Sequence, residues 1–252
     1  MKFHIVIPAR MASERLPGKP LLSVGPCSLI EAVYRRAMKS AAASVIIATD
    51  AEEICQAAKG FNAEAVMTDS GHTSGSDRIS ECADIMGWPD DTLIVNLQGD
   101  EPLMPARCLD QVAELAALDP QADVASLYWP IRNAAEAKDS NVVKAVVAAD
   151  GSALYFSRSL IPFPRGKSLA NMVKDHAGWK RHIGLYAFRA GALRAFSAMP
   201  PSALESIEKL EQLRFLEAGK RIVMAKACAE IPAGVDTPED LERVRALMQQ
   251  GA

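Results

Sequence analysis

Short apolar runs alternate with stretches of helical periodicity in the first half of the chain, and this alternation restricts the folds it can adopt. Apolar, partly β-branched runs at 3–7, 45–48 and 93–97 predict buried strands. Apolar residues that recur every three or four positions predict helices. These lie at 29–38, 54–58, 79–86 and 109–118. The alternation indicates an α/β fold with a mostly parallel central sheet and helices on both faces.

The second half has a different pattern. Runs at 142–147, 153–156 and 183–188 read as strands without long helices between them, so we expect a smaller mixed α/β extension. With 252 residues, 49% of them hydrophobic, the chain can bury one full core. We therefore expect residues 1–252 to form a single domain, in which roughly 125–220 make a subdomain.

Two helices are predicted near the C-terminus. The first, at 203–217, would turn four apolar residues inward and end before Gly219. The four are Ile207, Leu210, Leu213 and Leu216. The second begins at DTPEDLERV, where Thr237 can cap the helix and Asp240 can reach back to the cap. This leaves the Asp236 side chain without a local role. Between the strands and these helices, residues 162–180 are polar and unpatterned, and we expect a long loop that closes over the ligand as a lid.

Charge and composition exclude several classes of protein. The net charge is −3, and lysine and arginine are scattered, so no basic surface for nucleic acid is expected. No run of 18 apolar residues and no cleavable leader is visible, so we expect a cytoplasmic protein without membrane insertion. Five cysteines without CxxC spacing suggest neither a disulfide framework nor a zinc ribbon, and we expect most to be buried.

The stretch IPARMASERLPGKPL, which follows the first predicted strand, concentrates cations among small residues. It is not a Walker loop, because Gly18-Lys19 is followed by proline, and no GxGxxG fingerprint is present. Arg10, Arg15 and Lys19 could wrap a triphosphate, with backbone N–H groups approaching the anion. The alternative is a solvated loop with scattered charges.

The segment NLQGDEP places Asp100 directly after a buried strand, at the edge where parallel sheets bind ligands. Mg²⁺ prefers one or two carboxylates together with phosphate oxygens, so Asp100 is a candidate metal ligand and Asp236 a candidate second one. A turn aspartate is the alternative reading.

Other polar residues leave two readings open. In HTSGSDR, Ser74 to Ser76 could contact a ligand, although capping is the expected role of Ser76, and Arg78 could either pair with a carboxylate or lie on the helix surface. His182 and Tyr186 lie four apart on one face of a predicted strand, where packing is the commoner role. Arg158, Glu211 and Gln212 are similarly ambiguous.

Eight segments in one order across the chain carry a resemblance to a known family. They are IPARMASERLPGKPL, ATD at 48–50, HTSGSDR, VNLQGDEP, ALYFSRSLIPFPR, RHIGLYAFR, LEQLR and GVDTPEDLERV. Together they resemble the 3-deoxy-manno-octulosonate cytidylyltransferases, or CMP-Kdo synthetases. The resemblance implies a GT-A-like nucleotidyltransferase fold, a homodimer, and a Mg²⁺-dependent reaction in which CTP and 3-deoxy-manno-octulosonate (Kdo) give CMP-Kdo and pyrophosphate for lipopolysaccharide biosynthesis.

The resemblance also implies roles for individual residues. The catalytic set is Lys19, Arg10, Asp100 and Asp236, of which Asp100 and Asp236 bind the metal. The nucleotide-binding set is Pro8, Ala9, Arg10, Ser13, Arg15, Lys19, Ser74, Gly75 and Arg78. The sugar-binding set is Gln98, Arg158, His182, Tyr186, Glu211 and Gln212.

Two departures from the family pattern are visible: Ser76 replaces a usual threonine, and GPCSLI at 25–30 replaces a usual NGKPMI. Two alternative functions stay open. One is a cytidylyltransferase for a related acidic sugar, such as 8-amino-Kdo or sialic acid, and the other is a non-catalytic sugar-nucleotide-binding protein. The second would predict loss of Asp100, Asp236 or Lys19, and all three are present.

Overall fold

In a computed structural model, residues 1–252 are described except for 13–14, 73, 167, 170–177 and 250–252. The described strands form one sheet with the order β3-β2-β1-β4-β8-β5-β9, and β6 joins it through β8 and pairs with β7. The strands in chain order are β1 Phe3–Ala9, β2 Ser44–Thr49, β3 Glu64–Met67, β4 Leu93–Asn96, β5 Val124–Pro130, β6 Lys144–Val147, β7 Ala153–Ser157, β8 Lys180–Arg189 and β9 Ile222–Lys226.

The sheet changes direction at β8. Strands β3, β2, β1 and β4 are mutually parallel, whereas β8 runs antiparallel to β4, β5 and β6, and β6 and β7 form an antiparallel pair. The expected parallel core with a mixed extension is therefore confirmed. Strands β3, β5 and β9 were not predicted from the sequence.

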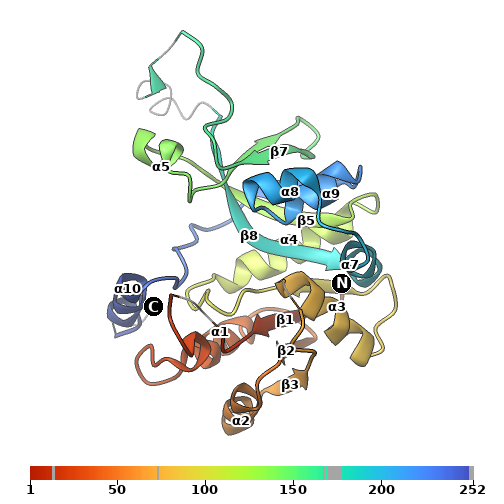
Figure 1. The fold of residues 1–252 in the computed structure, drawn as a ribbon, viewed down its shortest axis with the longest axis vertical. Helices are drawn as coiled ribbons and strands as arrows, with labels where there is room; N and C mark the ends of the chain where they lie inside the picture. The colour runs from red at the N-terminus through yellow and green to blue at the C-terminus, as the bar shows by residue number, and fades with distance from the viewer. Residues whose placement is uncertain (13–14, 73, 167, 170–177, 250–252) are drawn as a thin grey trace.

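Helices cover both faces of the sheet (Figure 1). They are α1 Leu29–Ala37, α2 Glu52–Gly60, α3 Gly75–Ile85, α4 Ala106–Leu118, α5 Ala134–Lys138, α7 Ala190–Ser197, α8 Ala203–Glu208, α9 Gln212–Glu217 and α10 Pro238–Gln249, with a 3₁₀ turn at Lys19–Leu21. Side chains alternate along β1: Ile5 and Ile7 pack with α1, α2 and α4 in one core, whereas Val6 packs with α3, α7 and α9 in the other.

The prediction of one continuous helix at 203–217 is wrong, because the structure has two helices there, α8 and α9. Lys209 adopts a left-handed backbone with φ of 54°, which ends α8 and separates it from α9. Leu210 and Leu213 are buried as expected, but Ile207 lies before the break and is 78% exposed. The chain turns here because Glu208 is fixed to the end of β7, where its carboxylate accepts hydrogen bonds from Ser157 Oγ and the backbone N–H of Arg158. Gly219, with φ of 70°, follows α9 as predicted.

The segment predicted as a long loop, 162–180, is fixed where it meets the sheet. Trp179 is buried, and its indole N–H donates to the carbonyl oxygen of Pro162 at 3.0 Å, directly before β8 begins at Lys180. Residues 167 and 170–177 lie outside the described residues, so the lid stays a prediction. Within the described helices, none has the length and apolarity that a membrane span requires. All five cysteines are free thiols, and Cys55, Cys82 and Cys108 are buried, as was expected of most of them.

A buried ion pair joins α8 to α9. The guanidinium of Arg214 donates to both carboxylate oxygens of Glu205, at 2.5 and 2.6 Å, and lies over the ring of Phe196. We expect Arg214→Met to lower the free energy of unfolding by about 3 kcal/mol, because it leaves the Glu205 carboxylate buried without its cation. Urea denaturation measures this change. Arg245→Met, which breaks the surface pair with Glu242, serves as the control and should cost under about 1 kcal/mol.

Candidate active site

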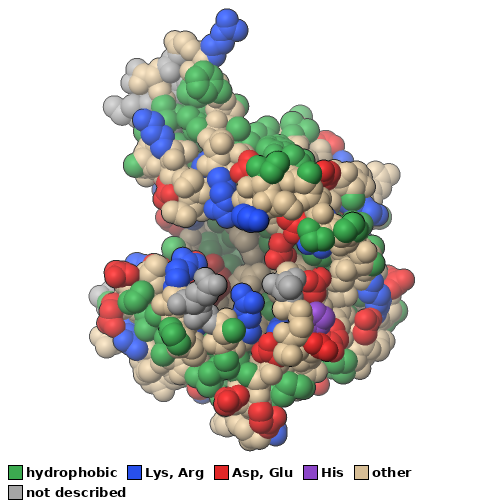
Figure 2. All heavy atoms as spheres, viewed as in Figure 1, with side chains coloured by type: hydrophobic (Ala, Val, Ile, Leu, Met, Phe, Trp, Pro, Cys, Tyr) green, Lys and Arg blue, Asp and Glu red, His purple; other side chains and the backbone are tan. Residues whose placement is uncertain are grey.

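A cleft of about 770 Å³ opens where β1 and β4 end, beside the first turn of α3. Figure 2 shows it as a hollow across the middle of the face, with basic side chains on both sides. Twelve of the predicted site residues line it: Pro8, Ala9, Arg10, Arg15, Lys19, Ser74, Gly75, Arg78, Gln98, Asp100, Glu211 and Asp236. Segments far apart in the sequence therefore meet at the ligand edge of the sheet, as the strand pattern predicted.

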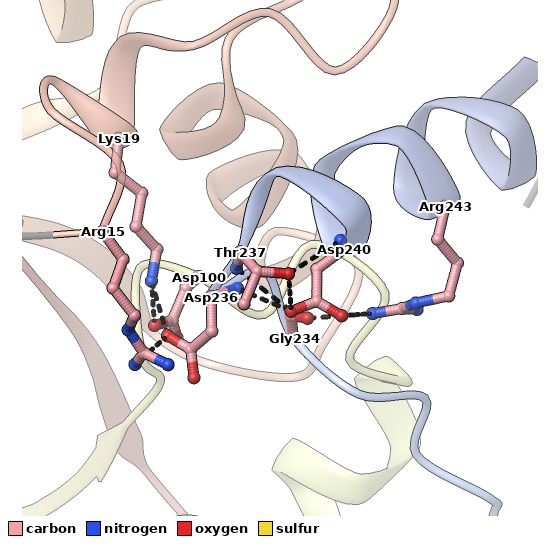
Figure 3. Close-up of polar contacts among 8 residues, drawn as sticks. All are labelled: Arg15, Lys19, Asp100, Gly234, Asp236, Thr237, Asp240 and Arg243. Atoms are coloured by element: carbon pink, nitrogen blue, oxygen red, sulfur yellow. Dashed lines mark hydrogen bonds and ion pairs between the residues drawn. The ribbon is translucent and has the colours of Figure 1, made fainter.

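Lys19 joins the two predicted metal-binding carboxylates (Figure 3). Its Nζ donates to Asp100 Oδ2 at 2.7 Å and to Asp236 Oδ1 at 3.1 Å, although the two aspartates lie far apart in the sequence. Arg15 adds a second cation, 3.2 Å from Asp236 Oδ1. Burial alone would lower the pKa of Lys19, but the charges and hydrogen bonds of both carboxylates raise it overall. The ammonium therefore stays protonated at neutral pH.

The carboxylates fit a divalent cation. No cluster of three or more His, Cys, Asp or Glu side chains suited to a metal occurs among the described residues, but Mg²⁺ needs only one or two carboxylates when phosphate oxygens complete its shell. Burial, followed by the charges of Asp100 and Asp236, raises the pKa of the neighbouring Glu101 to about 8, and Glu101 Oε2 lacks a hydrogen-bond partner among the described residues. Because Glu101 is protonated at neutral pH, Asp100 and Asp236 are the two charged carboxylates at this end of the cleft that could bind a cation.

Local sequence explains how each aspartate is held. Asp100 follows Gly99, which comes so near β1 that a Cβ atom there would lie 2.9 Å from the carbonyl oxygen of Pro8. Asp236 precedes α10. The N-terminal end of this helix is capped by Thr237, whose Oγ1 accepts a hydrogen bond from the N–H of Asp240 at 3.2 Å. The capping prediction is confirmed, and the Asp236 carboxylate is left to pair with cations across the cleft.

The first turn of α3 supplies another wall of the cleft. Ser74, not Ser76, caps this helix, since Ser74 Oγ accepts from the N–H of Asp77 at 3.1 Å. The cap predicted at Ser76 is wrong, because the helix already begins at Gly75 and the Ser76 hydroxyl instead donates to Glu211 Oε2 at 3.1 Å. Of the two readings of Arg78, the ion pair is observed: the side chain is buried and lies 2.7 Å from Asp50 Oδ2.

Comparison with known proteins shows the family to which this chain belongs. A cytidylyltransferase family model matches residues 4–222. Over 250 residues, 99% of this chain and 100% of the relative, the chain is 49% identical to the 3-deoxy-manno-octulosonate cytidylyltransferase of Thioalkalivibrio sulfidiphilus (strain HL-EbGR7). The chain belongs to the 3-deoxy-manno-octulosonate cytidylyltransferase family.

Further members and solved structures agree with this assignment. The 3-deoxy-manno-octulosonate cytidylyltransferase of Cellvibrio japonicus (strain Ueda107) is 46% identical over 254 residues, with both chains fully covered. The solved structure of CMP:2-keto-3-deoxy-manno-octonic acid synthetase complexed with CTP superposes with a TM-score of 0.91 at 42% identity, again over all of both chains. A cytidylyltransferase from Leptospira borgpetersenii, at 16% identity, covers all of this chain and 88% of its own with a TM-score of 0.65, which shows the shared fold alone. The predicted nucleotidyltransferase fold is thus confirmed.

Four sugar-binding residues suggested by the cytidylyltransferase resemblance do not line the cleft. They are Arg158, His182, Tyr186 and Gln212. The Arg158 guanidinium donates to the carbonyl oxygens of Glu208 and Ser140, at 2.7 and 3.1 Å. Gln212 is buried, and its Nε2 lacks a partner among the described residues. Glu211 and Gln98 do line the cleft, so the sugar-binding role of the six stays a prediction. Ser13 lies outside the described residues.

His182 lies in a row of aromatic rings. Its ring centroid is 4.9 Å from that of Phe156 and 5.4 Å from that of Tyr186, and its Nε2 is 3.2 Å from Ser126 Oγ. The packing that the sequence offered as the alternative role of His182 and Tyr186 is therefore observed. Four lining residues were not in the predicted site: Ala12, Pro20, His72 and Gly99. All four belong to motifs that the sequence had already singled out.

We expect the imidazole of His182 to stay neutral between pH 8 and pH 5, because burial lowers its pKa to about 3. In the unfolded chain a histidine titrates near pH 6.5. His182 therefore contributes stability that is fully present above about pH 6.5 and is lost as the pH falls toward 3. Nitrogen-15 NMR of the labelled imidazole, with the signal assigned by its absence in His182→Gln, should show no titration in this range. A midpoint near pH 6.5 would show that the ring is open to solvent.

Proposed function

We propose that this protein catalyses the reaction of CTP with Kdo to give CMP-Kdo and pyrophosphate, which supplies activated Kdo for lipopolysaccharide biosynthesis. The observation that carries the proposal is the meeting of Lys19, Asp100 and Asp236 in one cleft, in a chain that matches 3-deoxy-manno-octulosonate cytidylyltransferases over its full length. On the family resemblance we also propose a cytoplasmic homodimer with Mg²⁺ as its cofactor, in which residues 125–220 contribute to sugar binding and dimerisation.

In this reaction the anomeric hydroxyl of Kdo attacks the α-phosphorus of CTP, and the bond to pyrophosphate breaks. Such a transfer depends on positioning and charge neutralisation more than on a covalent intermediate. The hydroxyl proton passes to solvent or to a basic oxygen, and no cysteine or serine nucleophile is required. The site must therefore bring a nucleotide with about four negative charges next to a sugar carboxylate.

Three cationic side chains in the loop after β1 could offset this negative charge: Arg10, Arg15 and Lys19. Arg10 lines the cleft without an ion pair to any described residue, so its guanidinium is free to bind a phosphate. Arg15 and Lys19 lie beside the acidic end of the cleft, where they would offset charge on the departing pyrophosphate. Asp100 and Asp236 would hold Mg²⁺, which when bound neutralises phosphate charge and polarises the phosphorus centre.

Glu211 and Gln98 would orient the second substrate from the other wall. Ser76 donates to the Glu211 carboxylate and fixes its direction, while burial raises the pKa of Glu211. The Gln98 amide donates to Asn96 Oδ1 at 3.3 Å, which leaves its carbonyl oxygen to accept from a sugar hydroxyl.

Phosphorus-31 NMR of the reaction mixture tests this function. With CTP, Mg²⁺ and Kdo, the three CTP signals should be replaced by one phosphodiester signal and one pyrophosphate signal in equal molar amounts. Formation of CMP without a phosphodiester would indicate hydrolysis, and unchanged CTP signals would refute the proposed reaction.

A further inference from the structure

Gly234 lies in the segment between β9 and α10, two residues before Asp236, at a place where the structure leaves no room for a side chain. Its backbone does not adopt the left-handed φ that favours glycine elsewhere in the chain. A Cβ atom at this position would lie 2.8 Å from the carbonyl oxygen of Asp100 and 2.9 Å from Glu101 Oε1. Both distances are shorter than real Cβ contacts, so alanine cannot fit without a shift of the backbone.

The atom in closest conflict cannot move away easily. The carbonyl oxygen of Asp100 accepts a hydrogen bond from the backbone N–H of Val235 at 2.9 Å, so it is fixed by the same segment that would carry the new Cβ. The Val235 side chain is fully buried in a small core with Leu241 and Val244 of α10. One hydrogen bond and one close approach therefore connect the backbone of Asp100 to the segment that carries Asp236.

Arg243 holds this segment from the opposite side (Figure 3). Its guanidinium donates to the carbonyl oxygens of Ala233 and Gly234, at 2.8 and 2.9 Å, and lies 3.1 Å from Asp240 Oδ1. In the close-up, Gly234 and Asp240 lie between Arg243 on one side and Lys19 and Arg15 on the other. The segment is thus fixed between the Asp100 loop and the helix, although residues 229–237 belong to no helix or strand.

We propose that Gly234 is a positioning residue that sets the separation of the Asp100 and Asp236 carboxylates, and that Arg243 maintains this position from the opposite side. The inference rests on the proposed function, in which the two carboxylates bind the metal. It predicts that moving the segment by a few tenths of an ångström weakens metal binding although neither carboxylate has changed. Residues that orient metal ligands commonly affect metal affinity about 10- to 100-fold.

The test compares Gly234→Ala with wild type by titrating Mn²⁺ into the protein with CTP and without sugar acid, following free Mn²⁺ by electron paramagnetic resonance. We expect binding about tenfold weaker in Gly234→Ala. In turnover assays the Mg²⁺ concentration for half-maximal rate should rise by a similar factor, while the KM for Kdo stays within about twofold. Gly60→Ala is the matched control, since a Cβ at Gly60 meets nothing within 4 Å, and it should bind Mn²⁺ as wild type does.

Equal Mn²⁺ affinity in Gly234→Ala and wild type would overturn the proposal, whatever happens to the melting temperature, because a purely structural role lowers only the latter. If Gly234→Ala does not fold, Arg243→Met tests the same clamp from the surface and should weaken Mn²⁺ binding several-fold, and unchanged binding there would also overturn it. The Mn²⁺ titration needs no turnover. A wild type that binds Mn²⁺ through Asp100 yet forms no CMP-Kdo would therefore refute the proposed function and not the positioning role.

Discussion

Asp100→Asn is expected to remove nearly all turnover and to leave the fold intact. Asparagine has the shape of aspartate but lacks the charge that would hold a divalent cation and that pairs with Lys19 at 2.7 Å. Loss of several kcal/mol of transition-state stabilisation corresponds to a rate about 10³-fold lower. Because the carboxylate borders the cleft and lies outside both main cores, the melting temperature should change little. Single-turnover measurement of pyrophosphate release, with the melting temperature alongside, checks both expectations.

The matched control for this substitution is Asp91→Asn, because Asp91 is exposed and lies before the opposite end of β4. It should retain wild-type turnover. Near-normal activity of Asp100→Asn would rule out the metal role of this carboxylate.

Lys19→Ala should lower the rate constant by the equivalent of about 2–4 kcal/mol, or about 30- to 1,000-fold. The Lys19 side chain is 14% exposed and its ammonium bridges two carboxylates, so its loss removes the charge nearest to both and, in the proposed mechanism, one donor to the phosphates. Lys39→Ala, at an exposed position on the surface after α1, should have no effect. The rate constant at saturating CTP and Kdo is the deciding quantity, and an unchanged value would argue against a phosphate clamp formed by the first loop.

Burial along the strand explains why several strands were predicted from the sequence and others were missed. Strands β1, β2 and β4 are buried over nearly their whole length, so they read as continuous apolar runs. Strand β3 has the burial pattern exposed, half-buried, buried, exposed, and β5 is interrupted by Ser126 and only partly buried at its end, so neither gives such a run. Strand β9 does contain a short apolar run at 222–225, which was not recognised as a strand. The break between α8 and α9 was missed because it depends on Glu208 meeting β7 and on Lys209, contacts that helical periodicity does not record.

In the candidate site, too, some residues could be predicted from the sequence and others could not. Asp100 and Lys19 were predictable because polar residues after parallel strands converge at one edge of the sheet, and Asp236 because its helix cap is filled by its neighbours. The place of Arg158 was not predictable, because its partners are backbone carbonyls of residues 18 and 50 positions away. Long-range backbone contacts of this kind leave no local pattern in a sequence.

Pyrophosphate release from CTP in the presence of Mg²⁺, measured in parallel with Kdo, 8-amino-Kdo and sialic acid, tests the central claim most directly. We expect rapid release with Kdo and little with the other two sugar acids. Release only with another sugar acid would contradict the assigned substrate while keeping the phosphate loop and the carboxylate pair. No release with any of the three would contradict the catalytic function itself.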